Sequence, residues 1–149
     1  MVTEVKVTVP VNDVLPYLLP NPRIKQEIIP YFMARIVDAE RFIGQYRFTP
    51  DTQKEAIPIT LTDKSAPWNE GSYTLHIEPD GSAALIRHED DKQQNDAICV
   101  DIGTLATMLL GYMRPLQLSQ LERIHGKIEL VNRLHSRIPE QTTYLPDFF

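Results

Sequence analysis

The sequence predicts an α+β domain with a mostly antiparallel sheet of about five strands and helices packed on one face. Three observations lead to this prediction. A short strand and a helix come first, followed by three strands of alternating polarity, one further strand, and then helices. Pro79-Asp80-Gly81-Ser82 joins two alternating segments, which indicates an antiparallel hairpin. The chain has 149 residues, 42% of them hydrophobic, which is enough for one core without disulfides.

Five segments are expected to form the strands. Ile57, Ile59 and Leu61 alternate with polar or small residues, a period of two that is typical of a half-buried strand. Pro58 within this segment is typical of a strand at a sheet edge. The predicted strands are residues 32–37, 57–61, 73–77, 83–88 and 97–100.

Helices are expected where a capping residue precedes apolar residues at helical spacing. Asp38 would cap a helix whose inward face is Phe42, Ile43 and Tyr46. Asp101 would cap a second one, with Ile102, Leu105 and Leu109 inward and Gly111 at its end. Ser119 and Glu122 have the spacing of a capping box, which predicts that a short helix begins there. The last helix carries Ile128, Val131, Leu134 and Ile138 and stops at Pro139.

Residues 1–30 differ from the rest of the chain. Val5, Val7 and Val9 alternate with polar residues and predict a strand, and residues 13–19 and 21–28 have the pattern of two short helices. Five prolines in thirty residues are typical of a connecting arm. A lone strand needs a partner sheet, so we expect residues 1–30 to be a linker and the remnant of a preceding domain. Residues 31–149 form the main domain in this interpretation.

The overall composition excludes several functional classes. A net charge of −5 and a pI of 5.3, without a basic cluster, argue against a nucleic-acid partner. No stretch reaches the roughly 18 apolar residues that a membrane span requires, so no membrane partner is expected. A single cysteine, Cys99, excludes a disulfide framework and a cysteine-rich zinc site. These features predict a protein of the cytoplasm.

Residue types that carry chemistry are few and scattered. The four histidines, His76, His88, His125 and His135, lack metal-binding spacing, although His76 and His88 fall on paired hairpin strands and could approach one another. No metal is predicted. The six glycines are scattered too, so the chain has no phosphate or dinucleotide loop and no cofactor site of its own is expected.

Three further features each allow a structural and a functional interpretation. Cys99 lies between Ile98 and Val100, and we expect an inert thiol in the core rather than a nucleophile. The acidic run 89–91 would attract a cation or, as we favour, form a solvated loop. Trp68 would stack on a ligand or, as we favour, close the open end of the sheet with its indole N–H bonded to a carbonyl group.

Several segments together carry a family resemblance. They are Met33-Ala34-Arg35-Ile36-Val37-Asp38, Ile59-Thr60-Leu61-Thr62-Asp63, Pro67-Trp68-Asn69-Glu70-Gly71, Tyr73-Thr74-Leu75, Val100-Asp101-Ile102-Gly103-Thr104-Leu105-Ala106, Leu110-Gly111-Tyr112 and the terminal Phe149. In order and spacing, residues 31–149 resemble the C-terminal domain of the "enhanced intracellular survival" family of GNAT-like N-acetyltransferases. The resemblance implies a sterol-carrier-protein fold that follows an acetyltransferase domain and a degenerate second copy of it.

The resemblance also implies a role for the chain terminus. Phe148-Phe149 places the α-carboxylate on a large apolar residue, whereas most chains end in polar residues that stay in water. Family members insert this carboxylate into the acetyltransferase site as the base for the substrate amine, and Phe149 holds the matching position. Acetyl-CoA would be the cofactor of the full-length protein. The coenzyme loop and the acid belong to the N-terminal domain, so this chain is not expected to be catalytic alone.

Two hypotheses follow. In the first, the chain is an accessory domain of a multidomain acetyltransferase, whose partners are the preceding domains of the same polypeptide. In the second, it is a stand-alone module that holds an apolar ligand between sheet and helices, lined by Leu105, Leu109, Val131 and Leu134. These side chains could also simply pack together, which is the more frequent outcome. A homo-oligomer and the identity of the acetyl acceptor are left open.

Overall fold

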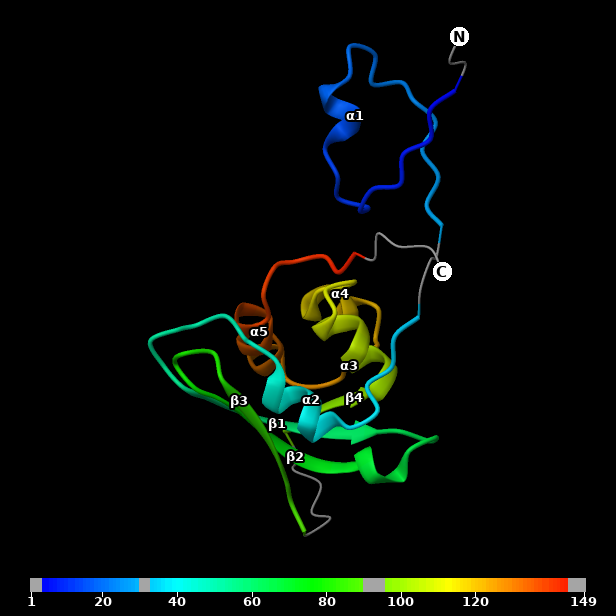
Figure 1. Ribbon diagram of the computed structural model, residues 1–149. Helices are drawn as coiled ribbons and strands as arrows, with labels where there is room; N and C mark the ends of the chain where they lie inside the picture. The colour runs from blue at the N-terminus through cyan, green and yellow to red at the C-terminus, as the bar shows by residue number, and fades with distance from the viewer. Residues whose placement is uncertain (1–3, 30–32, 90–95, 145–149) are drawn as a thin grey trace.

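A four-stranded sheet forms one layer of the domain (Figure 1). The computed structural model describes residues 4–29, 33–89 and 96–144. The strands are β1 (Glu55–Thr62), β2 (Gly71–Ile77), β3 (Ala83–Arg87) and β4 (Ile98–Asp101). Their order across the sheet is β3-β2-β1-β4, so the last strand in the chain lies beside the first.

The predicted hairpin is confirmed. β2 and β3 pair antiparallel, with Leu75 opposite Leu85. Gly81 in the connecting turn has a φ of +85°, a conformation that L side chains rarely adopt. A Cβ atom at Gly81 would also lie 2.2 Å from the carbonyl oxygen of Phe48, so this turn requires glycine for two independent reasons.

The predicted number of strands is wrong, and the mostly antiparallel sheet contains one parallel pair. Among the described residues the sheet has four strands and is mixed, because β4 runs parallel to β1, with Ile59 opposite Ile98. The segment predicted as a fifth strand, residues 32–37, is not a strand over its described part, 33–37. Its backbone bonds elsewhere: the carbonyl oxygen of Val37 accepts the side-chain N–H groups of Trp68 and Asn69.

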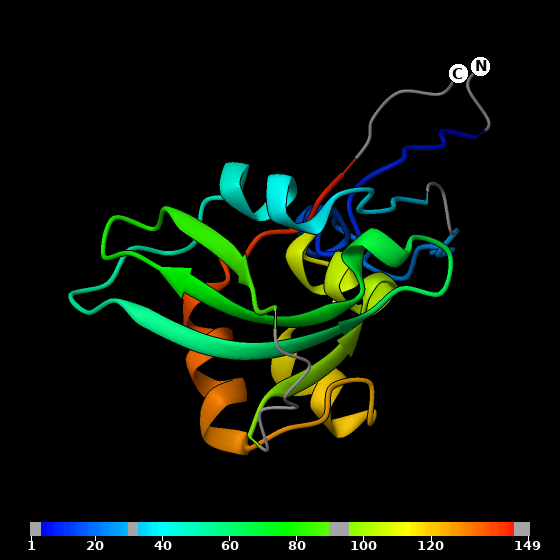
Figure 2. The same ribbon diagram turned by 90° about the horizontal axis from the view of Figure 1, so that it is seen from below.

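Helices cover one face of this sheet, as predicted (Figures 1 and 2). They are α2 (Ala39–Gln45), α3 (Ile102–Leu109), α4 (Pro115–Gln120) and α5 (Ile128–Arg137), with a short 3₁₀ turn η1 (Pro67–Asn69) before β2. The two predicted aspartate caps are confirmed. Asp38 accepts the N–H of Arg41, and Asp101 accepts the N–H of Thr104.

The capping box predicted at Ser119 is wrong, because α4 begins four residues earlier and ends at Gln120. Pro115 occupies the first helical position, where its missing N–H costs nothing. The side-chain oxygen of Gln117 accepts the backbone N–H of Arg114, 2.9 Å away. This pairing caps the helix at its true start.

The core lies between the sheet and the helices. One face of each strand is inward, and from β1 and β4 it contributes Ile57, Ile59, Leu61, Ile98 and Val100. Facing them are apolar side chains of the helices: Ile43, Leu105, Met108, Leu109, Val131 and Leu134. The opposite face of the sheet carries alternating residues that are exposed or half-buried, such as Thr60, His76, Ile86 and Cys99.

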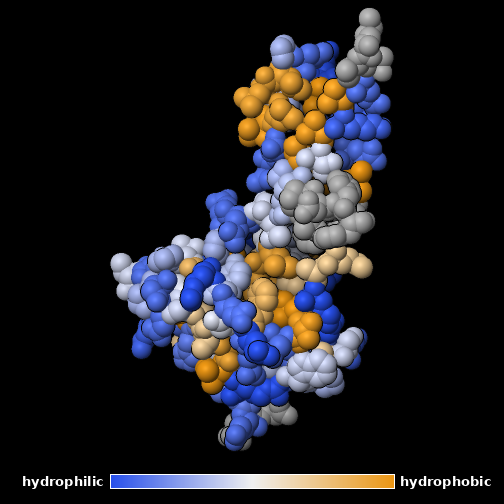
Figure 3. Space-filling model, in the orientation of Figure 1, coloured by the Kyte–Doolittle hydropathy of each residue, from blue (hydrophilic) through white to orange (hydrophobic). Residues whose placement is uncertain are grey.

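The N-terminal residues 4–29 do not form the predicted strand or the second predicted helix. Residues 5–9 are not in a strand, and Val5 and Val7 are exposed. Only a short helix, α1 (Leu15–Leu18), forms within the predicted helix 13–19. In place of a helix at 21–28, the side chain of Asn21 accepts the N–H of Arg23. Figure 3 shows much hydrophobic surface on this segment around α1.

Candidate functional site

The site residue implied by the family resemblance, Phe149, lies outside the described residues, as does Phe148. The same holds for Asp90 and Asp91 of the acidic run, while Glu89 is exposed.

The histidines do not converge. The hairpin register places His76 opposite Ala84, and it carries His88 beyond β3, where its backbone N–H bonds to Ser72. The ring Nε2 of His88 lies 2.8 Å from the hydroxyl of Thr74. Within residues 4–29, 33–89 and 96–144, no group of three potential metal ligands comes together.

The prediction that Cys99 lies in the core is wrong, since its side chain is exposed. The apolar neighbours were correctly identified as buried, with Ile98 and Val100 at 1% and 5% exposure. Because side chains alternate along a strand, burial of these two places Cys99 on the open face. The backbone N–H and C=O groups of Cys99 bond to those of His125 in an isolated antiparallel bridge. This bridge satisfies Cys99 on the side of β4 that faces away from β1.

Trp68 was expected to close the open end of the sheet with its indole N–H bonded to a carbonyl group. The hydrogen bond is confirmed, but the ring is not buried. The indole N–H donates to the carbonyl oxygen of Val37 at 2.8 Å, as expected. The ring itself is 61% exposed, so it does not close the core. Its neighbour Asn69, only 2% exposed, occupies the interior position instead.

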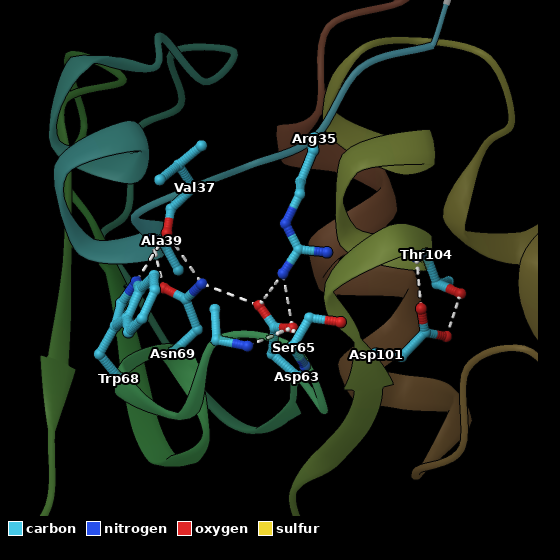
Figure 4. A network of polar contacts seen from close by, with 10 residues as sticks. Arg35, Val37, Ala39, Asp63, Ser65, Trp68, Asn69, Asp101 and Thr104 are labelled. Atoms are coloured by element: carbon cyan, nitrogen blue, oxygen red, sulfur yellow. Dashed lines mark hydrogen bonds and ion pairs between the residues drawn. The ribbon is translucent and has the colours of Figure 1, made fainter.

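A buried carboxylate, Asp63, organises the end of β1 (Figure 4). It accepts two hydrogen bonds from one guanidinium nitrogen of Arg35, at 2.7 and 2.8 Å, and one from the amide of Asn69 at 3.0 Å. The backbone N–H groups of Ser65 and Ala66 complete its shell. The Asn69 bond, followed by the Arg35 and Ser65 bonds, lowers the pKa of Asp63 against the opposing effect of burial.

Asn69 joins this carboxylate to the start of α2. Its amide nitrogen also donates to the carbonyl of Val37, and its side-chain oxygen accepts the N–H of Ala39. Every polar atom of the Asn69 side chain therefore has a partner. Such a fully satisfied network fixes a chain segment, here residues 35–39, against the sheet, and we assign it a structural role.

A second buried polar group is the guanidinium of Arg137, which is only 1% exposed. It donates to three backbone carbonyl oxygens, those of Thr49, Gln53 and Glu78, at 2.6–2.9 Å. This arginine thus ties α5 to the segment before β1 and to the end of β2.

The residues that follow α5 are held against the domain at two points and contact the N-terminal segment at a third. The guanidinium of Arg114 donates to the carbonyl oxygens of His135, Ile138 and Pro139 at 2.7–2.9 Å. Gly111 has a φ of +75° and lies against the segment that follows α5. A Cβ atom at Gly111 would be 1.9 Å from the carbonyl oxygen of Gln141. Residues 138–144 are hereafter called the tail segment.

The third point links the tail segment to the N-terminal part of the chain. The hydroxyl of Tyr144 donates to the carbonyl oxygen of Thr8 at 2.9 Å. In Figure 1 the ribbon of residues 139–144, in red, leaves the domain on the side where the N-terminal segment lies. The tail segment and the N-terminal segment are therefore neighbours although they stand at opposite ends of the sequence.

The four residues proposed to line an apolar cavity, Leu105, Leu109, Val131 and Leu134, are packed in the core, each at most 3% exposed. An open pocket of about 410 Å³ lies instead beside α3, α4 and the connection between them. It is lined by Thr104, Thr107, Tyr112, Met113, Leu118, Leu121 and Arg123. Arg123 is engaged at its rim by the hydroxyl of Thr104 and the carboxylate of Asp101.

Sequence reasoning missed the roles of Arg114 and of the buried Arg137, and it missed the Asp63–Asn69 pair. No motif surrounds Arg114 or Arg137, and their acceptors are carbonyl groups that the sequence does not display. The sequence did indicate a role for Asn69. Asparagine is common in turns because its side-chain amide bonds to backbone groups, and Asn69 stands just before a predicted strand.

Over the described residues, no helix has the length and apolar character needed to cross a membrane. No curated protein resembles the sequence significantly. Among solved structures, the chain is similar to a conserved protein of unknown function from Enterococcus faecalis V583, a probable N-acyltransferase. The two share 32% identity and a TM-score of 0.83, over 95% of this chain and 34% of that one.

Two further structures share the fold at lower identity. Eis1 from Mycobacterium abscessus is 19% identical with a TM-score of 0.67, over 94% of this chain and 33% of its own. A GCN5-related N-acetyltransferase from Kribbella flavida is 21% identical with a TM-score of 0.66, over 77% and 28%. The chain thus spans about a third of the length of the proteins it matches. Residues 39–146 match the family model of the sterol carrier protein domain, and the chain belongs to that family.

Proposed function

We propose that the chain is the C-terminal accessory domain of a multidomain, acetyl-CoA-dependent amine N-acetyltransferase. The observation that carries the proposal is the match to the E. faecalis probable N-acyltransferase at 32% identity, over 95% of this chain but 34% of that protein. A domain that corresponds to one third of such a protein is expected to work beside the remaining two thirds. The preceding domains of the polypeptide would bind acetyl-CoA and hold the acceptor amine.

The contribution of this domain to the chemistry would be the carboxylate of Phe149. An ammonium group must lose a proton before its nitrogen can attack the thioester carbonyl of acetyl-CoA. A carboxylate that is partly removed from water has a raised pKa, which makes it a better acceptor for that proton. The aromatic rings of Phe148 and Phe149 would provide the apolar surroundings. The domain alone lacks the coenzyme site and is expected to be inactive.

The path of the tail segment supports this role. Arg114 and Gly111 fix its backbone at residues 138–141, and Tyr144 reaches the N-terminal segment at Thr8. Residues 4–29 carry many exposed apolar side chains, among them Val5, Val7, Tyr17 and Leu18, as expected of a segment that belongs to a neighbouring domain. The tail segment is therefore directed toward the part of the chain that would connect to that domain.

The test uses the full-length polypeptide that contains this domain. Deletion of Phe149 moves the carboxylate by one residue and should reduce kcat for amine acetylation by at least a hundredfold, because a general base contributes about 10²–10⁴. Phe149→Leu keeps an apolar residue and the carboxylate position and serves as the control, with most of the activity retained. Equal activity of the wild type and the deletion variant would refute the assignment of the base.

A second candidate function rests on the pocket beside α3 and α4. Tyr112, Met113, Leu118 and Leu121 give it apolar walls, and Figure 3 shows hydrophobic surface over these two helices. In this function the chain would be a sterol-carrier-like module that binds an apolar ligand there. Native mass spectrometry of the chain mixed with a fatty acid should then show a bound adduct that Leu121→Arg, at an exposed position of the lining, abolishes. The absence of any adduct with the wild-type chain would exclude it.

A further inference from the structure

We propose that the pocket beside α3 and α4 binds a small aromatic carboxylate, and that Arg123 recognises the carboxylate group of this ligand. The inference rests on the second candidate function, the binding of an apolar ligand in the same pocket, and adds the chemical class of the ligand. It concerns the 149-residue chain alone and can be tested without any acetyltransferase activity.

The charge of the pocket comes from one side chain. Among the described residues that line it, Arg123 is the only charged one. Its side chain is 60% exposed, and it contacts the hydroxyl of Thr104 at 3.2 Å and the carboxylate of Asp101 at 3.6 Å. A guanidinium has five N–H donors, so these two contacts leave donors for a ligand. The polar group that suits this end of the pocket is therefore an anion.

The threonine hydroxyls of the lining donate their protons within the domain. Oγ1 of Thr104 donates to Asp101 at 2.6 Å, as Figure 4 shows. Oγ1 of Thr107 donates to the carbonyl oxygen of Gly103 at 2.8 Å. Neither hydroxyl has a second proton for a ligand. The donor for an anionic group beside these threonines is therefore Arg123.

The neighbouring carboxylate limits the charge of the ligand. Asp101 lies 3.6 Å from Arg123 and would repel a second anion. A phosphate group brings about 1.5–2 negative charges to the site. A carboxylate brings one, and its two oxygens match the fork of a guanidinium. A monocarboxylate is therefore favoured over a phosphate ester.

The remaining walls favour an aromatic body for the ligand. Leu118 is buried, whereas Tyr112 and Leu121 are exposed to 73% and 58% beside the pocket. A ligand ring can stack on Tyr112 and contact the sulfur atom of Met113, and both contacts are favourable for aromatic groups. The volume of about 410 Å³ is near the lower end of the usual range for ligand sites. Such a pocket suits one or two rings better than a long chain.

The backbone at the edge of the pocket supports a binding role. Glu122 follows α4 with a φ of 56°, a left-handed conformation in which glycine is the usual residue. It stands between Leu121 and Arg123, and both of these neighbours line the pocket. Non-glycine residues in this conformation are uncommon and cluster at ligand sites.

The experiment titrates the 149-residue chain with 2-naphthoate and, separately, with 2-naphthalenemethanol, a neutral molecule of similar shape. Amide NMR spectra locate the site and give both affinities. 2-Naphthoate should shift amides within residues 104–123 and bind at least fivefold more tightly than the alcohol, because a hydrogen bond between charged groups is stronger than a neutral one.

Three variants assign the difference to Arg123. Arg123→Gln should lower the affinity for 2-naphthoate to that for the alcohol and leave the alcohol unaffected. Asp101→Asn keeps an acceptor for the N–H of Thr104 but removes the neighbouring negative charge, so it should tighten 2-naphthoate at least twofold. Arg41→Gln, at an exposed position of α2, is the matched control and should change neither affinity.

Each contrary outcome has a distinct meaning. If neither compound shifts any amide, both this inference and the second candidate function are overturned. If both compounds bind at residues 104–123 with equal affinity, the inference fails and the second candidate function stands. If Arg123→Gln weakens both compounds alike, Arg123 shapes the pocket but does not recognise the carboxylate, which also overturns the inference.

Discussion

Arg137 donates a hydrogen bond to the carbonyl oxygen of Glu78 at 2.6 Å and so joins two residues that stand 59 positions apart in the chain. Glu78 follows β2 at the start of the hairpin turn, and Arg137 is the last residue of α5. A buried charged group thus connects the helical layer to the sheet. The bond has direct consequences for stability.

Replacing this arginine is expected to be costly. Arg137→Met keeps an apolar chain of similar length but leaves the carbonyls of Thr49, Gln53 and Glu78 without their donor. We expect the free energy of unfolding to fall by about 3–5 kcal/mol. Chemical denaturation measures the change, and Arg41→Met, at an exposed position, should remain within about 0.5 kcal/mol of the wild type. A loss below about 1 kcal/mol in Arg137→Met would show that water replaces the guanidinium there.

Asn69 offers a second test of buried polar packing. Asn69→Ala removes one acceptor from the N–H of Ala39 and one donor each from Val37 and Asp63. The expected loss is about 2–4 kcal/mol, since each buried group left without a partner carries its own penalty. Asn132→Ala, on the exposed side of α5, is the matched control and should be neutral or slightly stabilising. Equal stabilities of the two variants would contradict a structural role of the Asp63–Asn69 pair.

Two glycines allow a direct comparison. Gly81→Ala introduces a Cβ atom at 2.2 Å from the carbonyl of Phe48 and at a positive φ, and should cost at least about 2 kcal/mol. Gly44→Ala places its Cβ in open space within α2 and should stabilise by roughly 0.5–1 kcal/mol. Thermal unfolding of the two variants should therefore shift in opposite directions. A shift of the same sign in both would refute this account of the hairpin turn.

His135 should make the domain sensitive to mild acid. Burial, together with the positive charge of Arg114, lowers the pKa of its imidazole below the usual 6.5, against a smaller opposing effect of Glu140. The unfolded chain therefore gains a proton as the pH falls below about 6.5, while the folded domain does not until its own lower pKa is reached. Stability contributed by the neutral ring is present above pH 6.5 and declines below it.

The measurement is the free energy of unfolding of wild type and His135→Gln between pH 7.5 and 5. The wild type should lose more stability over this range than the variant, whose side chain does not titrate. Parallel curves for the two proteins would show that His135 does not couple to folding.

Local chemistry made part of the fold predictable from the sequence. The hairpin at Gly81 and the helix starts at Asp38 and Asp101 depend on residues that lie within a few positions of each other, and all three predictions are confirmed. The parallel pairing of β4 with β1 depends on a contact between Ile98 and Ile59, which no local pattern specifies.

The errors have the same origin. The apolar run around Cys99 identified a strand correctly, but it did not show which face of that strand turns inward, because the rest of the sheet determines this. The apolar run ending at Val37 resembled a strand. In the structure, however, the carbonyl oxygen of Val37 accepts hydrogen bonds from the side chains of Trp68 and Asn69 and not from a neighbouring strand. Arg114 and Arg137 gave no signal, because an arginine that bonds to backbone carbonyl groups is recognised only when those carbonyl groups are in place. For Phe149 the family resemblance, rather than any pattern in the residues, supplied the prediction.

The position of β4 in the sheet has a kinetic consequence. β1, β2 and β3 pair with strands that follow one another directly in the sequence. The pairing of Val100 with Leu61, in contrast, closes a long loop of the chain. Closing that loop costs entropy before any pairing is gained, so we expect β4 and α3 to dock onto a meander that has already formed. In pulse-labelled refolding, the amide of Leu75 should be protected before the amide of Val100, and the domain would acquire its sheet in two stages.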